Sequence, residues 1–348
     1  MSVFEHSEFD GHEHVAFYQD ASSGLKAIIA VHNSNLGNAL GGCRMWPYAT
    51  DEEALRDVLR LSKGMTYKAA MAGLNQGGGK AVIIGNPRTE KTPEKMVAMG
   101  NFIDSLSGKY ISAEDSGLTV DDLKLMGNQT RHVSGIQAKY HINSEPADGN
   151  PAPSTAYGVY VGLKTTVAKA MNSDLNGVKV AIQGLGHVGL RLAKHLHSQG
   201  ACLYVTDIHT ENIEKAVNEY SAIAVSPEDI FDLDVDVFAP CAMGAILDEK
   251  NIARLKVKAI AGAANNQLAK EEFGQLLADK GILYAPDYVI NAGGIIDIYH
   301  QSISSSDSQM REHIEKISDT LLEIYSRAQS QGIATNIVAN QIAEERFG

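Results

Sequence analysis

The sequence predicts an α/β protein of two domains separated by a cleft, with a doubly wound parallel sheet in the second domain. Strand-like and helix-like segments alternate along the 348 residues, and such βα units fold into mostly parallel sheets with right-handed crossovers. A stretch rich in Gly, Pro, Asn and Ser, from Gly135 to Pro153, interrupts the alternation and is typical of an inter-domain linker. We therefore expect one domain over residues 1–145 plus 330–348, and the other over residues 146–329.

In the first half of the chain, short β-branched or aromatic runs predict three strands: Leu25 to Val31, Lys80 to Ile84 and Tyr110 to Ala113. Helices are expected to begin at Thr50 and at Thr92-Pro93, because a threonine cap and a proline in the first turn favour helix starts. Asp115 follows the third strand closely. It would therefore lie at the carboxyl end of a strand, where open α/β sheets bind their ligands.

The βα alternation is clearer in the second half. The strands expected there are Val178 to Gln183, Ala201 to Val205, Val235 to Ala239, Val257 to Ala261 and Ile282 to Tyr284. A helix is expected from Val188 to His197, between the first two of these strands. Two further helices, Met310 to Ala328 and Asn336 to Glu345, would close the chain.

Composition excludes several classes of partner. The net charge is −12, and no run of Lys and Arg occurs, so neither nucleic acid nor an anionic membrane surface is an expected partner. No apolar run approaches the roughly 18 residues that span a bilayer, and the acidic first residues do not resemble a signal peptide. Cys43, Cys202 and Cys241 are far apart, which favours buried free thiols in the cytoplasm over a disulfide or metal site.

A glycine fingerprint follows the first strand of the second domain. Gly184-Leu185-Gly186-His187-Val188-Gly189 fits the G-x-G-x-x-G pattern between a strand and a helix. In this pattern one glycine makes a tight turn, the next lets the backbone approach a pyrophosphate, and the last permits close packing of the helix. The helix N-terminus would face the phosphates, so the pattern predicts a Rossmann dinucleotide-binding domain.

The next strand ends at Asp207, about twenty residues after the fingerprint. An acidic residue at this position accepts hydrogen bonds from ribose hydroxyls and repels a 2′-phosphate. The following residues, Ile208, His209 and Thr210, supply no arginine to offset that repulsion. NAD is therefore expected rather than NADP.

A second glycine-rich segment, Gly77-Gly78-Gly79-Lys80, does not fit the nucleoside-triphosphate loop, because Lys80 is followed by Ala81. A lysine that follows three glycines in a loop can be packed closely against backbone and lose contact with water. Loss of water lowers the pKa of a lysine and makes it a usable general base. Lys68, Lys80 and Asp115 would all lie at strand–loop junctions facing the dinucleotide domain.

Longer motifs are spread over nearly the whole chain: LGGCRMWPY (Leu40 to Tyr48), LSKGMTYKAAMAGLNQGGGKAVIIG (Leu61 to Gly85), SAEDSG around Asp115, AIQGLGHVG, FAPCAMG (Phe238 to Gly244), GAANNQL (Gly262 to Leu268) and YAPDYVINAGG (Tyr284 to Gly294). In content and order they resemble the leucine dehydrogenases of the Glu/Leu/Phe/Val dehydrogenase family. The resemblance implies NAD-dependent oxidative deamination of an L-amino acid to a 2-oxo acid and ammonia.

The resemblance also implies roles for individual residues. Lys68 would bind the substrate carboxylate, Lys80 would activate the water that attacks the imine, and Asp115 would move protons at the substrate amino group. Substrate would also be contacted by Gly41, Gly42 and Asn265. Contacts to the cofactor, besides the fingerprint, Asp207 and Ile208, would come from Cys241, Ala242, Ala263, Asn265 and Asn291. No metal is expected.

The side-chain pocket implied by the resemblance is apolar and consists of Leu40, Ala113, Ile295 and Ile298, and Met65 would also contact the substrate. A glutamate substrate would need a cation there, so we expect leucine, valine or isoleucine. Apolar walls discriminate weakly, however, with one methylene worth about 1–3 kcal/mol. The alternatives are therefore a phenylalanine or tryptophan dehydrogenase, or a non-catalytic NAD-binding regulator with the same fold. The resemblance further implies a homo-oligomer, either a dimer or an octamer.

Overall fold

The first sheet has five strands and mixed pairing, in the order β1-β2-β4-β3-β5. Its strands are β1 (His14–Asp20), β2 (Leu25–Asn33), β3 (Ala39–Trp46), β4 (Gly77–Ile84) and β5 (Tyr110–Glu114). β2 runs antiparallel to β1 and β4, whereas β3 runs parallel to β4 and β5. β1 and β3 have no counterpart among the strands predicted from the sequence. β1 is a partly exposed edge strand, and β3 contains two glycines, which lower strand propensity.

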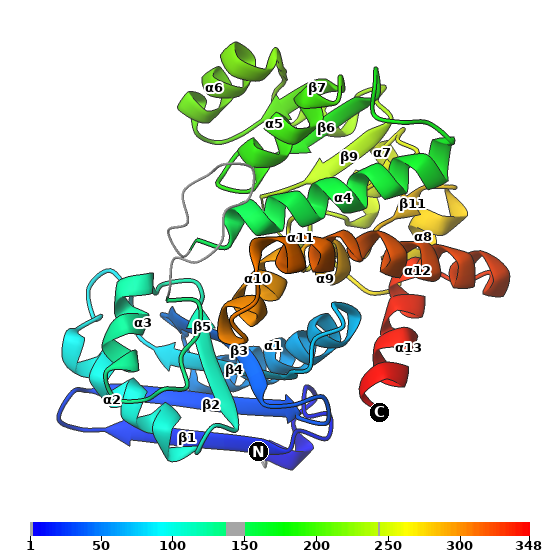
Figure 1. Cartoon of the computed structure of the whole chain (residues 1–348). Coiled ribbons are helices and arrows are strands. Elements are labelled where there is room, and N and C mark those ends of the chain that lie inside the picture. Colours follow the sequence, from blue (N-terminus) through cyan, green and yellow to red (C-terminus); the bar gives the residue numbers. More distant parts are fainter. Residues whose placement is uncertain (1–2, 137–149, 243) are drawn as a thin grey trace.

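Helices cover both faces of this sheet, in a computed structural model that describes residues 3–136, 150–242 and 244–348 (Figure 1). They are α1 (Asp51–Met71), α2 (Pro93–Ser105) and α3 (Val120–Gly127). The neighbouring residues Ile28 and Ile29 of β2 point to opposite faces, so Ile28 packs with α1 and Ile29 packs with α2. As expected, Thr50 and Thr92 cap the first two helices by accepting hydrogen bonds from backbone N–H groups.

The glycines before Lys80 form part of a strand, so the prediction of a loop was wrong. Gly77, Gly78 and Gly79 are the first residues of β4, which lies between β2 and β3. A Cβ atom on Gly78 would lie 2.0 Å from the backbone nitrogen of Thr66 in α1. The glycines are required because α1 packs directly on the β4 backbone, and this close packing brings the last turn of α1 near Lys80.

The second sheet has six parallel strands, in the order β11-β10-β9-β6-β7-β8. They are β6 (Lys179–Gln183), β7 (Cys202–Thr206), β8 (Ile223–Ala224), β9 (Val237–Pro240), β10 (Ala259–Ile260) and β11 (Leu283–Tyr284). The strand order reverses between β6 and β9, which is the switch point where doubly wound folds bind ligands. The predicted two-domain α/β fold with a Rossmann-like domain is confirmed.

The helices that accompany the second sheet are α5 (Gly189–Ser198), α6 (Thr210–Tyr220), α7 (Glu249–Arg254) and α8 (Phe273–Asp279). The remaining helices are α4 (Ala152–Met171), α9 (Asp287–Ile290), α10 (Gly293–Ser302), α11 (Asp307–Glu315), α12 (Ile317–Gln331) and α13 (Thr335–Phe347). α10, α11 and α12 pack against α4, while α13 returns to α1 of the first domain (Figure 1). The predicted domain boundary between residues 145 and 146, and most of the predicted linker, lie outside the described residues.

The single helix predicted from Met310 to Ala328 is two helices, α11 and α12, which meet at Lys316. Apolar residues continue across the junction, since Ile314 and Ile317 are both buried. The hydrophobic pattern therefore carries no sign of the break.

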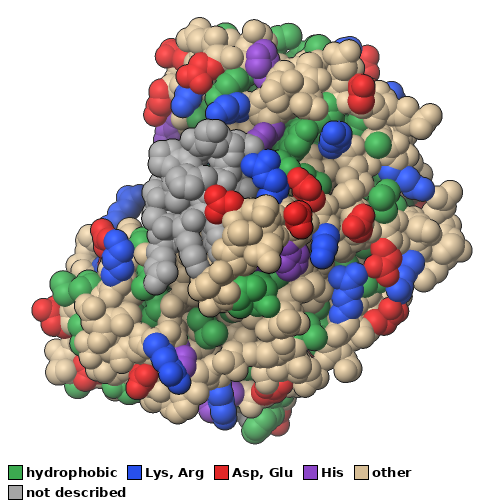
Figure 2. Space-filling model, in the orientation of Figure 1, with side chains coloured by type: hydrophobic (Ala, Val, Ile, Leu, Met, Phe, Trp, Pro, Cys, Tyr) green, Lys and Arg blue, Asp and Glu red, His purple; other side chains and the backbone are tan. Residues whose placement is uncertain are grey.

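The surface of the molecule carries charges of both signs. In Figure 2, acidic and basic side chains are interspersed over the visible face. Within the part of the chain that is described, every helix is too short or too polar to cross a bilayer.

The prediction of buried thiols was wrong for Cys202, which is exposed because its side chain points outward at the start of β7. Cys43 is buried and Cys241 is partly buried.

Candidate active site

A cleft of about 890 Å³ lies between the two domains. β3, β4, β5 and α1 form one wall, and the opposite wall consists of segments from the second domain and α13. The predicted site residues that line it are Leu40, Gly42, Met65, Lys68, Lys80, Ala113, Asp115, Val188, Ala263, Asn265, Asn291, Ile295 and Ile298. Gly41 does not line the cleft. It lies where β3 passes very close to Gly79, and its carbonyl accepts a hydrogen bond of 2.7 Å from the Tyr110 hydroxyl.

Lys80 and Asp115 form an ion pair at the base of the cleft. Lys80 is 5% exposed on β4, and its Nζ donates to Oδ2 of Asp115, which follows β5. A Cβ atom on Gly42 would lie 2.7 Å from the Asp115 Cβ, so this glycine leaves the space that the carboxylate occupies. Burial raises the pKa of Asp115, but the charges of Lys80 and Arg44 outweigh burial and hold that pKa well below its usual range.

Lys68 lies in the last turn of α1, so its predicted position at a strand–loop junction was wrong, and it contacts the second domain across the cleft. Its Nζ donates to Oδ1 of Asn291 at 2.6 Å, and the Asn291 amide in turn donates to Oδ1 of Asn265 at 2.7 Å. Burial lowers the pKa of Lys68 to about 8, and the neighbouring charge of Lys80 acts in the same direction, whereas Asp287 and Asp115 oppose the shift. Lys68 is therefore a cation that can lose its proton slightly above neutral pH.

Several charged residues that line the cleft were not predicted, and two of them, Asp287 and Arg44, lie close to the predicted ones. The Asp287 carboxylate is partly buried near Lys68 and accepts hydrogen bonds from the backbone nitrogens of Gln267 and Tyr288, at 2.9 and 2.7 Å. Burial raises the pKa of Asp287. Arg44, on β3, lies 3.5 Å from Oδ1 of Asp115. Both residues are part of the quoted motifs, which was the only signal that could have identified them.

The predicted side-chain pocket is largely apolar and buried. Leu40 on β3 and Ala113 on the adjacent strand β5 are 1% and 3% exposed. Ile295 and Ile298 lie nearly one turn apart on α10 and face the same cleft. An aliphatic group placed between these walls would be removed from water.

The fingerprint glycines lie at the switch point of the parallel sheet, and each meets a different requirement. Gly184 has a φ of +96°, which disfavours other residues. A Cβ atom on Gly189 would lie 2.0 Å from the Gly184 carbonyl, whereas one on Gly186 would meet no atom of the described residues within 4 Å. Among the same residues, no side chain caps α5, which leaves its first N–H groups for a ligand. The open space at Gly186 beside these N–H groups fits the pyrophosphate of a dinucleotide.

The other predicted cofactor residues surround this fingerprint. Asp207 follows β7, and its carboxylate accepts hydrogen bonds from the N–H groups of Leu185 and His209. Cys241 and Ala242 follow β9, and Ala242 closely approaches Gly184. Ile208 is 89% exposed. Within the described ranges, no group of three or more His, Cys, Asp or Glu side chains is placed to hold a metal ion.

Comparison with known proteins assigns both halves of the chain to one family. Residues 12–132 match the Glu/Leu/Phe/Val dehydrogenase dimerisation domain, and residues 203–346 match the Glutamate/Leucine/Phenylalanine/Valine dehydrogenase domain. The chain belongs to the Glu/Leu/Phe/Val dehydrogenase family. The resemblance inferred from the motifs is confirmed.

Relatives within the family cover almost the whole chain. A leucine dehydrogenase of Thermoactinomyces intermedius is 48% identical over 348 residues, which span 100% of this chain and 94% of that relative. A phenylalanine dehydrogenase of Caldalkalibacillus thermarum is 44% identical over 353 residues, again spanning 100% of this chain and 94% of the relative. The crystal structure of L-tryptophan dehydrogenase from Nostoc punctiforme superposes with a TM-score of 0.85 at 44% identity, over 97% of this chain and 96% of that one. The chain is thus an amino-acid dehydrogenase, and the alternative prediction of a non-catalytic NAD-binding regulator was wrong.

Proposed function

We propose that this amino-acid dehydrogenase catalyses the NAD-dependent, reversible oxidative deamination of a branched-chain aliphatic L-amino acid to its 2-oxo acid and ammonia. The observation that carries the proposal is the position of Lys68, Lys80 and Asp115 in a single cleft whose apolar walls include Leu40 and Ile295. The charged groups suit the part shared by all amino acids, and the apolar walls suit an aliphatic side chain.

Each charged group has a distinct task in the proposed reaction. Lys68 binds the substrate carboxylate, which persists through the reaction, so this contact orients the substrate. NAD bound at the fingerprint would supply the acceptor for the hydride that leaves the substrate Cα, and an imino acid results. Asp115 takes up and returns protons at the substrate nitrogen. Lys80 removes a proton from the water that attacks the imino carbon, after which ammonia leaves.

The ion pair between Lys80 and Asp115 supports this division of labour. The two groups are in direct contact, so a proton taken up at one can pass to the other without crossing bulk water. Gly42 leaves space beside the Asp115 carboxylate, and the cleft provides access for substrate.

The choice of NAD rests on Asp207. Its carboxylate follows β7 beside the fingerprint, where it would accept hydrogen bonds from the ribose and repel a 2′-phosphate. The next two residues are Ile208 and His209, so no neighbouring arginine is present to bind a 2′-phosphate. The small-molecule partners are then an L-amino acid, NAD and ammonia. Assembly as a homo-oligomer, dimer or octamer, stays a prediction.

Aromatic amino acids form the second candidate substrate class. The L-tryptophan and phenylalanine dehydrogenases are almost as similar to this chain as the leucine dehydrogenase is. The aliphatic class is favoured because Ile295 and Ile298 both project branched side chains into the cleft and leave less room for a ring.

A panel of substrates tests the proposal. NAD reduction would be followed at alkaline pH with leucine, valine, isoleucine, phenylalanine, tryptophan and glutamate, and repeated with NADP. We expect kcat/KM for one of the branched-chain substrates to exceed that for phenylalanine by roughly tenfold or more. A higher value for phenylalanine or tryptophan would contradict the aliphatic preference, and absence of turnover with every substrate would contradict NAD-dependent deamination.

A further inference from the structure

A second cation contacts Asp115 on the side away from Lys80. Nη2 of Arg44 lies 3.5 Å from Oδ1 of Asp115, whereas Lys80 binds Oδ2. The sheet explains the placement. β3 and β5 are parallel neighbours in which Cys43 pairs with Glu114, so the next residues along the two strands, Arg44 and Asp115, are adjacent. Each carboxylate oxygen of Asp115 therefore faces a different cation.

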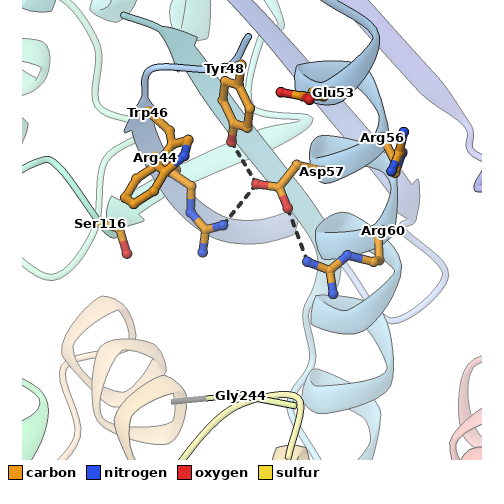
Figure 3. Close-up of a pocket in the computed structure, with 9 residues that line it drawn as sticks. All are labelled: Arg44, Trp46, Tyr48, Glu53, Arg56, Asp57, Arg60, Ser116 and Gly244. Atoms are coloured by element: carbon orange, nitrogen blue, oxygen red, sulfur yellow. Dashed lines mark hydrogen bonds and ion pairs between the residues drawn. The ribbon is translucent and has the colours of Figure 1, made fainter. Parts of the chain in front are cut away.

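Arg44 is itself held by a carboxylate of α1. Its Nη1 donates to Oδ2 of Asp57 at 2.9 Å, and the same oxygen accepts the Tyr48 hydroxyl at 2.6 Å. Arg60 donates to the other oxygen of Asp57 at 3.2 Å. Figure 3 shows these three side chains converging on Asp57. The Arg44 guanidinium is thus fixed between Asp57 and Asp115.

Burial strengthens the electrostatic interactions between these charged side chains. The side chains of Arg44, Asp57 and Asp115 are 24%, 15% and 17% exposed, so they are weakly screened compared with a surface ion pair. Burial lowers the pKa of Arg44, but Asp115 and Asp57 raise it by more, and the guanidinium keeps its proton throughout.

The Asp115 carboxylate needs a positive counter-charge that persists throughout the reaction. Under the proposed function, on which this inference rests, Lys80 has to be neutral before it can take a proton from the attacking water. If Lys80 were the only cation beside Asp115, the carboxylate would then be buried without a counter-charge, which is costly. Because Arg44 does not titrate in the working range, it remains a counter-charge at every stage.

We infer that Arg44 is a positioning residue, which uses its contact with Asp57 to hold the Asp115 carboxylate in one orientation and to keep it ionised while Lys80 changes charge. Arg44 acts through Asp115 and is not itself assigned a contact with the reacting atoms.

Other charged groups around Asp115 also affect the pH profile. They are Lys80 on β4, Lys68 on α1, Glu114 on β5 and Asp122 on α3. The two carboxylates raise the pKa of a neighbouring acid, whereas the lysines lower it. All four stay in place in the variants below, so a difference between variants reports on Arg44.

The test compares Arg44→Gln and Arg44→Lys with Arg56→Gln. Arg56 lines the same groove as Arg44 (Figure 3), is exposed, and makes no ion pair or hydrogen bond with any residue that the structure describes. In Arg44→Gln the pair of Lys80 and Asp115 loses a neighbouring positive charge, which favours the protonated form of the pair. We expect the acid limb of the kcat/KM profile to move up by about one pH unit, and kcat to fall roughly tenfold to hundredfold.

Arg44→Lys keeps the positive charge, and we expect its acid limb to stay near that of the wild type, with a smaller loss of kcat. Arg56→Gln should match the wild type within about twofold. An Arg44→Gln enzyme with the wild-type melting temperature and an unchanged acid limb would overturn the inference.

Asp57→Asn covers the case in which Arg44→Gln does not fold. It removes the group that holds Arg44 but leaves both cations beside Asp115. We expect kcat to fall several-fold with the acid limb at or below its wild-type position, and wild-type kinetics would overturn the inference. Turnover by the wild-type enzyme in the same assays tests the proposed function separately.

Discussion

The two sheets build their parts of the site by different means. In the parallel sheet, the predicted cofactor site consists mainly of backbone: the open space at Gly186 and the uncapped start of α5. In the mixed sheet, the site consists of ionised side chains on buried strands, chiefly Lys80 and Asp115. The first site therefore depends on shape, whereas the second depends on a balance of charge. This difference predicts different responses to substitution.

The largest effect is expected from removing charge in the mixed sheet. Lys80→Ala removes the proposed base and one cation of Asp115, so kcat should fall on the order of a hundredfold to ten-thousandfold. NADH binding should persist because the cofactor site uses backbone of the other sheet. Energy transfer from Trp46, the only tryptophan, to bound NADH measures that binding.

Lys63→Ala is the matched control for this variant. Lys63 is also a lysine at the cleft, but its side chain is 40% exposed and pairs with Asp10 at 2.7 Å. Its removal should change kcat by less than about threefold. Equal losses in the two variants would mean that the general charge of the cleft matters and that Lys80 has no special role.

An intermediate effect is expected from adding a methyl group to the backbone site. In Gly186→Ala the added methyl group meets no atom of the described residues within 4 Å, so the melting temperature should be unchanged while KM for NAD rises roughly tenfold to hundredfold. Gly189→Ala would instead meet the Gly184 carbonyl, and its melting temperature should fall by several degrees. Steady-state kinetics and thermal melts of both variants measure these effects. An unaltered KM for NAD in Gly186→Ala would mean that the phosphates of NAD do not bind beside Gly186.

The smallest effect is expected from exchanging one cation for another at Lys68. Because its pKa is lowered to about 8, Lys68 loses its charge as the pH rises through that value. Inhibition by isocaproate, a carboxylate without an amino group, should weaken roughly tenfold per pH unit above about 8. In Lys68→Arg the guanidinium stays protonated, so the affinity should not depend on pH in this range. The same pH dependence in both proteins would assign the titration to another group.

The parallel sheet was the more predictable of the two regions. Its strands are β-branched runs, and Gly184, Gly186 and Asp207 form a local pattern that can be recognised within about two dozen residues. The fold of this domain and its glycine fingerprint could therefore be predicted from local sequence patterns. The glycines before Lys80 wrongly predicted a loop, because a strand that packs directly against a helix needs glycine as much as a loop does.

The contacts in the charged site were less predictable because they join distant parts of the chain. The contact between Arg44 and Asp115 requires that β3 be recognised as a strand and placed beside β5, and its glycines conceal it. The hydrogen bond between Lys68 and Asn291 joins residues 223 positions apart. The motifs could identify Lys68, Lys80 and Asp115, but not which partner each would have.

The hydrogen bond between Lys68 and Asn291 has a consequence for how substrate enters. The Asn291 amide oxygen occupies, at 2.6 Å, one of the three N–H donors of the Lys68 ammonium group, which leaves two for the proposed substrate carboxylate. Under the proposed function, substrate can therefore bind while this hydrogen bond persists. The bond holds the flexible lysine side chain in place beforehand, so less conformational entropy is lost when the carboxylate arrives.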